Sequence, residues 1–308
     1  MSEINTQIAR VSSNRTALAR RGTAVIAKRG LDDLVSQENA EVWFQKAKKL
    51  YDAVPKNLPI TEFRASLGEF FRCLQRAADL DPQHPGIQFW LGTAYRDGLG
   101  TERDIEAAAT WIRRASEKDL VEAQFQFAGM LKYGEGVPED GSAAVGLFRK
   151  AAEQKHVDAQ VALGVAYGDG SGVGKDLVES THWFRQAAEQ NSIIAQSFLA
   201  EALAEGKGVQ KNLGEAAEWY YKAASQGMAT AQFMLGKLYY NGLGIPEDLK
   251  EAEYWFGEAA EQGHKEAKIM LEVCLAGIDR KTMQEVARKR GVIAQNERAG
   301  GPGLTTKK

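Results

Sequence analysis

The sequence is poor in the residues that build disulfides and metal sites. Its 308 residues include two cysteines and four histidines, and no histidine stands four positions from another histidine or from a cysteine, the spacing with which one helix face holds zinc. We therefore expect no metal site and no cofactor. Cys73 and Cys274 lie near opposite ends of the repeats described below, too far apart for a disulfide, which needs Cα atoms within about 7 Å. They should be free thiols in a cytoplasmic or other reducing compartment.

Long apolar runs and catalytic motifs are missing too. No stretch of about 18 uncharged apolar residues occurs, which argues against a membrane-spanning helix. The start of the chain does not have the pattern of a secretory signal, so we expect none. The run 170–175 departs from a phosphate-binding loop, because Asp169 and Asp176 stand where Gly and Ser or Thr are required. With no catalytic constellation recognisable, we expect the protein not to be an enzyme.

Charge is distributed unevenly although the net charge is only −2. Residues 1–31 and 278–308 each carry five more basic than acidic residues, so an acidic body lies between two basic ends. The net charge gives no reason to expect nucleic-acid binding, and membrane contact would involve only the ends. For the basic extension 1–36 three interpretations stay open: a flexible tail, an amphipathic helix for a membrane or acidic partner, and an organelle transit peptide.

The middle of the chain repeats itself every 36 residues. Counting a recurrent glutamine as position 0, the pair Ala-Gln occurs at 123–124, 159–160, 195–196 and 231–232, and Gln88 lies one period earlier. Position 3 is Leu or Phe, position 7 is Leu or Tyr, and position 4 is Gly or Ala. This spacing predicts a helix, helix A, with one buried stripe and a close approach to a neighbouring helix.

A second helix follows in each repeat after a glycine-containing loop. Glycines stand at positions 10 and 12, as in Gly98 and Gly100, and a glycine just past a helix supplies the left-handed residue that ends it. Asp or Asn at position 16, as at Asp104 and Asn212, predicts the N-cap of helix B. Helix B carries Trp at position 23 in four of the five repeats and Ala at position 27 in all five, which indicates a second buried stripe.

These units should build a solenoid. One pair of short helices cannot bury its own apolar face, so the five repeats of 88–267 are predicted to stack into an all-α, right-handed superhelix. Residues 38–54 and 61–80 each have the spacing of one helix, and we interpret 37–87 as a divergent tetratricopeptide-like pair that caps the N-terminal end. A capping box at Thr282 predicts that 268–291 cap the other end, followed by a disordered basic tail at 292–308.

The repeat resembles that of the Sel-one-like repeat (SLR) family, a relative of the tetratricopeptide repeats. The family pattern of Ala-Gln, Leu-Gly, Tyr, Gly-x-Gly, Asp, Trp-Phe and Ala-Ala-Glu-Gln-Gly is met most fully by 232–263. The resemblance implies an adaptor that holds protein complexes together. Its partner would be a protein or peptide, and it would have no small-molecule substrate.

The face of helix A opposite its buried stripe is the predicted partner-binding surface. In tetratricopeptide-like folds the A helices line the concave wall, and at about 100° per residue the opposite positions are 1, 5, 8 and 9. The residues that we expect to contact a partner there are Phe89, Arg96, Phe125, Lys132, Tyr133, Val165, Phe233, Lys237 and Tyr240. Aromatic and basic residues together are typical of interface anchors. The alternative is that the residues at position 1 pack against the next helix A.

The sequence therefore favours a non-enzymatic scaffold or adaptor that binds a protein segment in a concave groove. Two other functions stay open. One is a chaperone, regulator or immunity protein that sequesters a single partner. The other is peripheral attachment to an acidic membrane or RNA through the basic ends.

Overall fold

The computed structural model describes residues 39–277, in which every regular element is a helix. This confirms the all-α fold class. The described residues form two compact units: 39–130 with Gly134–Pro138, and Leu131–Tyr133 with 139–277. The basic extension 1–36, the capping box at Thr282 and the tail 292–308 lie outside the described residues.

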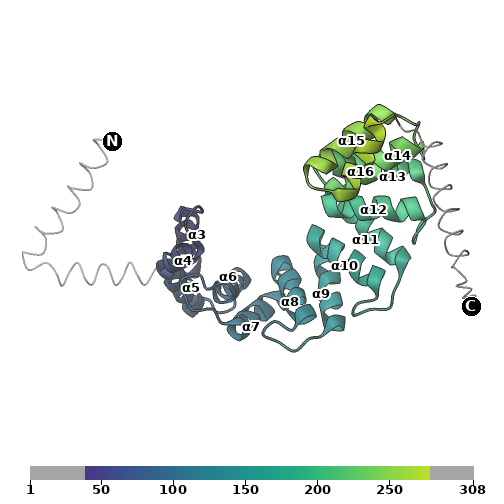
Figure 1. Ribbon diagram of the computed structural model, residues 1–308. Helices are drawn as coiled ribbons and strands as arrows, with labels where there is room; N and C mark the ends of the chain where they lie inside the picture. The colour runs from purple at the N-terminus through teal and green to yellow at the C-terminus, as the bar shows by residue number, and fades with distance from the viewer. Residues whose placement is uncertain (1–38, 278–308) are drawn as a thin grey trace, which may run out of the picture. The chain divides into compact units, whose positions relative to one another are not determined.

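The first unit contains the helices that precede and begin the repeats. They are α3 (Ala40–Ala53), α4 (Ile60–Ala65), α5 (Gly68–Leu80), α6 (Pro85–Asp97), α7 (Ile105–Ser116) and α8 (Val121–Tyr133), whose last three residues count with the second unit. Helix α3 packs on α5, and α6 pairs with α7 (Figure 1). A core cluster that includes Phe44, Phe70, Leu74 and Leu91 joins α3 and α5 to α6.

The predicted single helix over 61–80 is interrupted. Ser66 and Leu67 form a turn between α4 and α5, and Leu67 departs from helical geometry. The interruption frees the carbonyl of Arg64, which accepts a hydrogen bond from the backbone N–H of Gly100 at 3.0 Å. The buried Leu67 also lies against Gly100. The first Gly-x-Gly loop therefore packs on the break, a tertiary contact that helical periodicity does not reveal.

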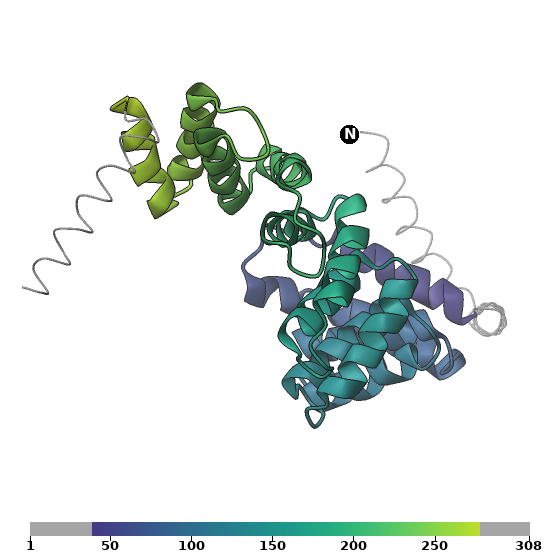
Figure 2. The same ribbon diagram turned by 90° about the vertical axis from the view of Figure 1, so that its right-hand side faces the viewer.

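The second unit is a row of antiparallel helix pairs. Its helices are α9 (Gly141–Glu153), α10 (Val157–Asp169), α11 (Leu177–Glu189), α12 (Ile193–Glu205), α13 (Leu213–Ser225), α14 (Ala229–Asn241), α15 (Leu249–Glu261) and α16 (Lys265–Leu275). Each of these helices packs on the next in the chain, as Figures 1 and 2 show from two sides. Even-numbered helices are A helices and odd-numbered ones are B helices.

The Gly-x-Gly loop ends helix A as predicted. The first glycine adopts a left-handed conformation in all five repeats, with φ between 60° and 82°. The second glycine also has positive φ and touches the helix B of the preceding repeat: a Cβ on Gly208 would overlap the carbonyl of Leu177. Glycine is thus required where one repeat meets the next.

Helix B begins at the predicted cap and packs closely on helix A. In all five repeats the side chain at position 16 accepts a hydrogen bond from a backbone N–H of the first turn, as Asn212 does from Glu215 N at 3.1 Å. The small residue at position 4 admits the partner helix, because Gly164 faces the ring of Phe184 with no room for a Cβ. The core of each repeat lies between its two helices.

Candidate protein-binding sites

In the first unit the predicted residues Phe89, Arg96 and Phe125 are all half-buried. Arg96 is held by its neighbours: its guanidinium donates two hydrogen bonds to the Asp97 carboxylate, each at 2.8 Å, and a third to Gln126 Oε1 at 2.6 Å. Arg96 therefore ties α6 to α8, and it reaches a partner only by giving up these contacts.

In the second unit some of the predicted residues are exposed and others pack within the repeat array. Tyr133 is 67% exposed, with the Lys132 ammonium 5.0 Å from its ring centroid. Lys237 is exposed and lies 5.4 Å from the ring centroid of Phe233. Phe233 itself is half-buried and stacks on the His264 ring at 4.5 Å. At Phe233, therefore, the geometry follows the alternative in which position 1 packs against the next helix A.

The expectation that Tyr240 faces solvent is wrong. Its side chain is 4% exposed and belongs to a core cluster with Ala252, Phe256 and Ala267. The helical-wheel argument assumed that helix A is buried on one side only. Position 8 lies only about 40° from position 4 around the helix, at the edge of the buried stripe. A large apolar residue at that edge joins the core.

Val165 lies in a cavity between α10, α11 and α12. The cavity has a volume of about 340 Å³, and the Phe198 ring, 40% exposed, stacks on Phe184 with centroids 4.8 Å apart. Gly168 stands at position 8, where other repeats have longer side chains such as Lys132, and its small size leaves the space open. Charged residues from α10, α12 and the adjoining loops surround this apolar floor: Asp169, Lys175, Glu201 and Lys207.

Sequence reasoning missed the two phenylalanines of this cavity, which we call the α10–α12 groove. Phe198 is at position 2 of its repeat, which the wheel places beside the predicted face, and Phe184 is at position 24 of helix B, for which no role was predicted. The signal that the sequence offered was a large apolar residue at position 2 of one repeat, combined with small residues at position 8 of that repeat and of the repeat before it. Single positions taken alone do not carry this information.

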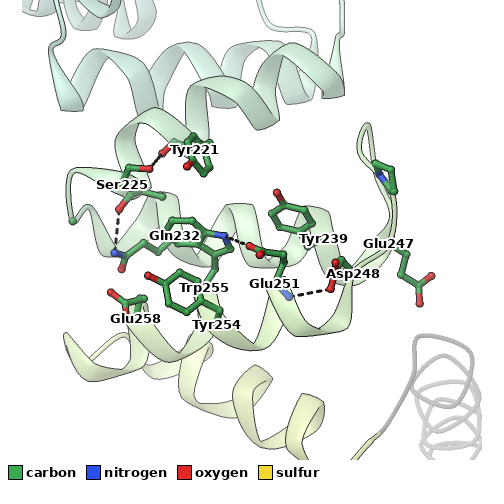
Figure 3. A pocket seen from close by; sticks show the side chains of 13 residues that line it. Tyr221, Ser225, Gln232, Tyr239, Glu247, Asp248, Glu251, Tyr254, Trp255 and Glu258 are labelled. Carbon is green, nitrogen blue, oxygen red and sulfur yellow. Dashed lines mark hydrogen bonds between the residues drawn. The ribbon is translucent and has the colours of Figure 1, made fainter.

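A second and larger pocket lies between α13, α14 and α15. Its volume is about 860 Å³, and Figure 3 shows aromatic rings and carboxylates around it. The aromatic side chains are Tyr221, Tyr239, Tyr254 and Trp255, and the acidic ones are Glu247, Asp248, Glu251 and Glu258. Among the 13 described residues that line the pocket there is no Lys, Arg or His. We call it the α13–α15 pocket.

Hydrogen bonds position two of its carboxylates. Asp248 caps α15 by accepting from the backbone N–H of Lys250 at 2.9 Å and of Glu251 at 3.1 Å. Trp255 Nε1 donates to Glu251 Oε2 at 3.1 Å (Figure 3). Burial, together with the negative charge of Glu251, raises the pKa of the Tyr239 hydroxyl. The pocket is therefore negative and partly apolar, a combination that suits a cation.

Within residues 39–277 no group of three or more His, Cys, Asp or Glu side chains is arranged to hold a metal ion. Among these described helices none is both long and apolar enough to cross a membrane. Cys73 and Cys274 are both free, and burial raises the pKa of each thiol.

Comparisons with known proteins point to one family. The model described as Sel1 repeat matches five segments: 88–120, 121–156, 157–192, 193–228 and 229–264. No curated protein matches the chain. The solved structures that are similar to it include two with the helical repeat fold.

The first is a protective antigen, c5321, present in uropathogenic Escherichia coli strains and displaying an SLR fold. It is 27% identical, with a TM-score of 0.71 over 87% of this chain and 56% of the antigen. This chain thus spans little more than half of that relative. The second is a Sel1 repeat protein from Oxalobacter formigenes, 29% identical, with a TM-score of 0.63 over 70% of this chain and 84% of the relative.

Proposed function

The chain belongs to the Sel1 repeat family, and from that premise we propose that it is a non-enzymatic scaffold that binds an extended segment of a partner protein in the α10–α12 groove. Sel1 repeat proteins are generally scaffolds for protein–protein interaction. The single observation that carries the choice of groove is Phe198, an aromatic ring that is 40% exposed at the floor of a cavity.

The groove has the composition of an anchor site. An apolar side chain of a partner can pack on Phe198, Phe184 and Val165, which lie together at the floor. Lys175 and Asp169 lie beside the floor and offer one charge of each sign to the flanking backbone and side chains, whereas Glu201 pairs with Lys207 at 3.7 Å. Burying one large apolar side chain is worth roughly 1.5–3 kcal/mol, so one anchor gives selectivity but needs neighbouring contacts for affinity.

Affinity capture with the full-length chain tests the proposal. We expect the wild-type chain to retain a partner from a lysate of its source organism, and Phe198→Asp to lose it, because a carboxylate cannot replace the ring. Tyr254→Ala is the matched control, since this ring is 55% exposed but lies on α15. Circular dichroism must first show that both variants are folded. The proposal fails if Phe198→Asp captures the same proteins as the wild type, or if the control loses them equally.

A further inference from the structure

The repeats provide an internal comparison for the α13–α15 pocket. In the preceding cleft, between α11 and α13, the guanidinium of Arg185 donates to Glu215 Oε1 at 2.7 Å. Thirty-six residues later, Tyr221 stands in place of Arg185 and Glu251 in place of Glu215. The carboxylate is thus kept while the arginine that binds it is replaced. Among the described residues no cation pairs with Glu251, and only its Oε2 accepts a hydrogen bond, from Trp255.

A second cation is also lost from this pocket. In the preceding cleft the Lys222 ammonium lies 3.7 Å from the ring centroid of Trp219, a close cation–π contact. One repeat later the tryptophan is kept as Trp255, but Glu258 stands in place of the lysine. Both cations of the preceding cleft are therefore absent, whereas the carboxylate and the indole that bind them remain.

We propose that the α13–α15 pocket binds an arginine side chain from a basic segment of a partner protein. The guanidinium takes the place that Arg185 has one repeat earlier, with its N–H groups on Glu251. Its flat face lies against the ring of Tyr221, which is 53% exposed and meets Trp255 edge to face at an interplanar angle of 79°. Arginine fits better than lysine, because the planar guanidinium group can donate two hydrogen bonds to a carboxylate while its face stacks on an aromatic ring. The pocket volume of about 860 Å³ admits a side chain together with part of its backbone.

The surrounding charge indicates a segment with more than one basic residue. Glu247 and Glu258 also line the pocket. An adjoining depression between α15 and α16 is lined by Glu253 and Glu261 together with one lysine, Lys250. These carboxylates raise the local concentration of a cationic peptide and are available to a second basic side chain. No residue of this pocket lines the α10–α12 groove, so the two sites are tested independently.

Binding of a labelled peptide to the full-length chain tests the inference. The probe is fluorescein-labelled Gly-Ser-Arg-Gly-Arg-Gly-Ser, with counterparts in which both arginines are Lys or Gln, followed by fluorescence anisotropy. We expect the arginine peptide to bind, the lysine peptide to bind more weakly, and the glutamine peptide not to bind. Glu251→Gln should weaken binding about tenfold or more, because the charge-assisted hydrogen bonds are lost.

Tyr221→Arg is the most specific variant, since it restores within this chain the arginine of the preceding repeat. The new guanidinium should pair with Glu251 and lower the affinity for the peptide by about tenfold or more. Glu215→Gln is the matched control, because that carboxylate is already occupied by Arg185. We expect the control to leave the affinity within about twofold of the wild type, and Phe198→Asp to do the same.

Four results would overturn the inference. One is a wild-type chain that does not bind the arginine peptide, and another is an equal affinity for the arginine and lysine peptides. A third is Tyr221→Arg or Glu251→Gln binding as well as Glu215→Gln. The fourth concerns the source of the arginine. If the wild type self-associates and Tyr221→Arg does not, or if replacing Arg288, Lys289 and Arg290 by Gln raises the peptide affinity, then this chain and not a partner supplies the arginine.

Discussion

Gln160, Gln196 and Gln232, the glutamines at position 0, each join two successive repeats through a buried side chain. The amide oxygen of Gln196 accepts from Gln226 Nε2 at 2.9 Å, and its amide nitrogen donates to the carbonyl of Ala188 at 3.4 Å. Gln226 ends helix B of the same repeat, whereas Ala188 ends helix B of the repeat before. The same two bonds recur around Gln160 and Gln232. The buried amide thus links two groups from helices of successive repeats, in addition to the local hydrogen bonds that these groups make.

Gln196→Ala should therefore destabilise the protein by about 1–3 kcal/mol, because it removes both hydrogen bonds and leaves a cavity at a buried position. Urea denaturation followed by circular dichroism measures the change, with the exposed Gln210→Ala as control. Gln196→Met separates the effect of losing the hydrogen bonds from the effect of creating a cavity, since methionine fills a similar volume without the amide. Full stability in the methionine variant would show that packing and not hydrogen bonding is the role of this glutamine.

The histidines show what residue-level reading of the sequence could not reach. His156 and His264 stand in the turns between repeats, where the sequence offers no partner for them. In the structure the Nδ1 of each accepts the backbone N–H three residues later, at 3.2 and 3.3 Å, and so caps the next helix A. Ser192 does the same at the start of α12, at 3.4 Å. Serine is a familiar cap and histidine is not, so residue preference indicated only one of these two kinds of cap.

At the scale of helices and loops the 36-residue period was sufficient. Because the pattern occurs in five copies, a deviating residue in one repeat does not hide it. The helix ends, the Gly-x-Gly loops and the caps at position 16 could therefore all be predicted. The α13–α15 pocket could not, because it depends on residues that depart from the repeat pattern, such as Tyr221 and Glu258. Their importance is visible only when the structure shows that position 25 of one repeat meets position 19 of the next, as Arg185 meets Glu215.

The second loop glycine gives a prediction at this scale. Gly208→Ala should destabilise the protein by about 2 kcal/mol or more, because it combines a positive φ with a collision against the carbonyl of Leu177. Gly174→Ala, in the loop of the preceding repeat, is the control, since no atom lies within 4 Å of the added Cβ. It should change stability by less than about 0.5 kcal/mol. Equal effects in thermal unfolding would refute the close contact between repeats.

In the whole second unit, stability should fall from the middle of the row towards its C-terminal helix. In an array whose repeats contact only their neighbours, the stability of each repeat depends on the interfaces at its two sides. Helices α12 and α13 each have six buried residues and pack on helices at both sides, whereas α16 buries only Ala267 and packs mainly on α15. Local opening of α16 therefore exposes few of the unit's buried residues to solvent.

Hydrogen exchange of the full-length chain measures this gradient. Backbone amides of α12 and α13 should exchange slowest in the second unit and those of α16 fastest, because exchange from a weakly packed end needs only local opening. In Gly208→Ala, exchange should accelerate in α11 and α12, the helices joined by the altered contact, and hardly in α3 and α5 of the first unit. Uniform protection from α9 to α16, accelerated equally by the substitution, would instead mean that the second unit unfolds as one cooperative body, and that nearest-neighbour stacking does not govern its stability.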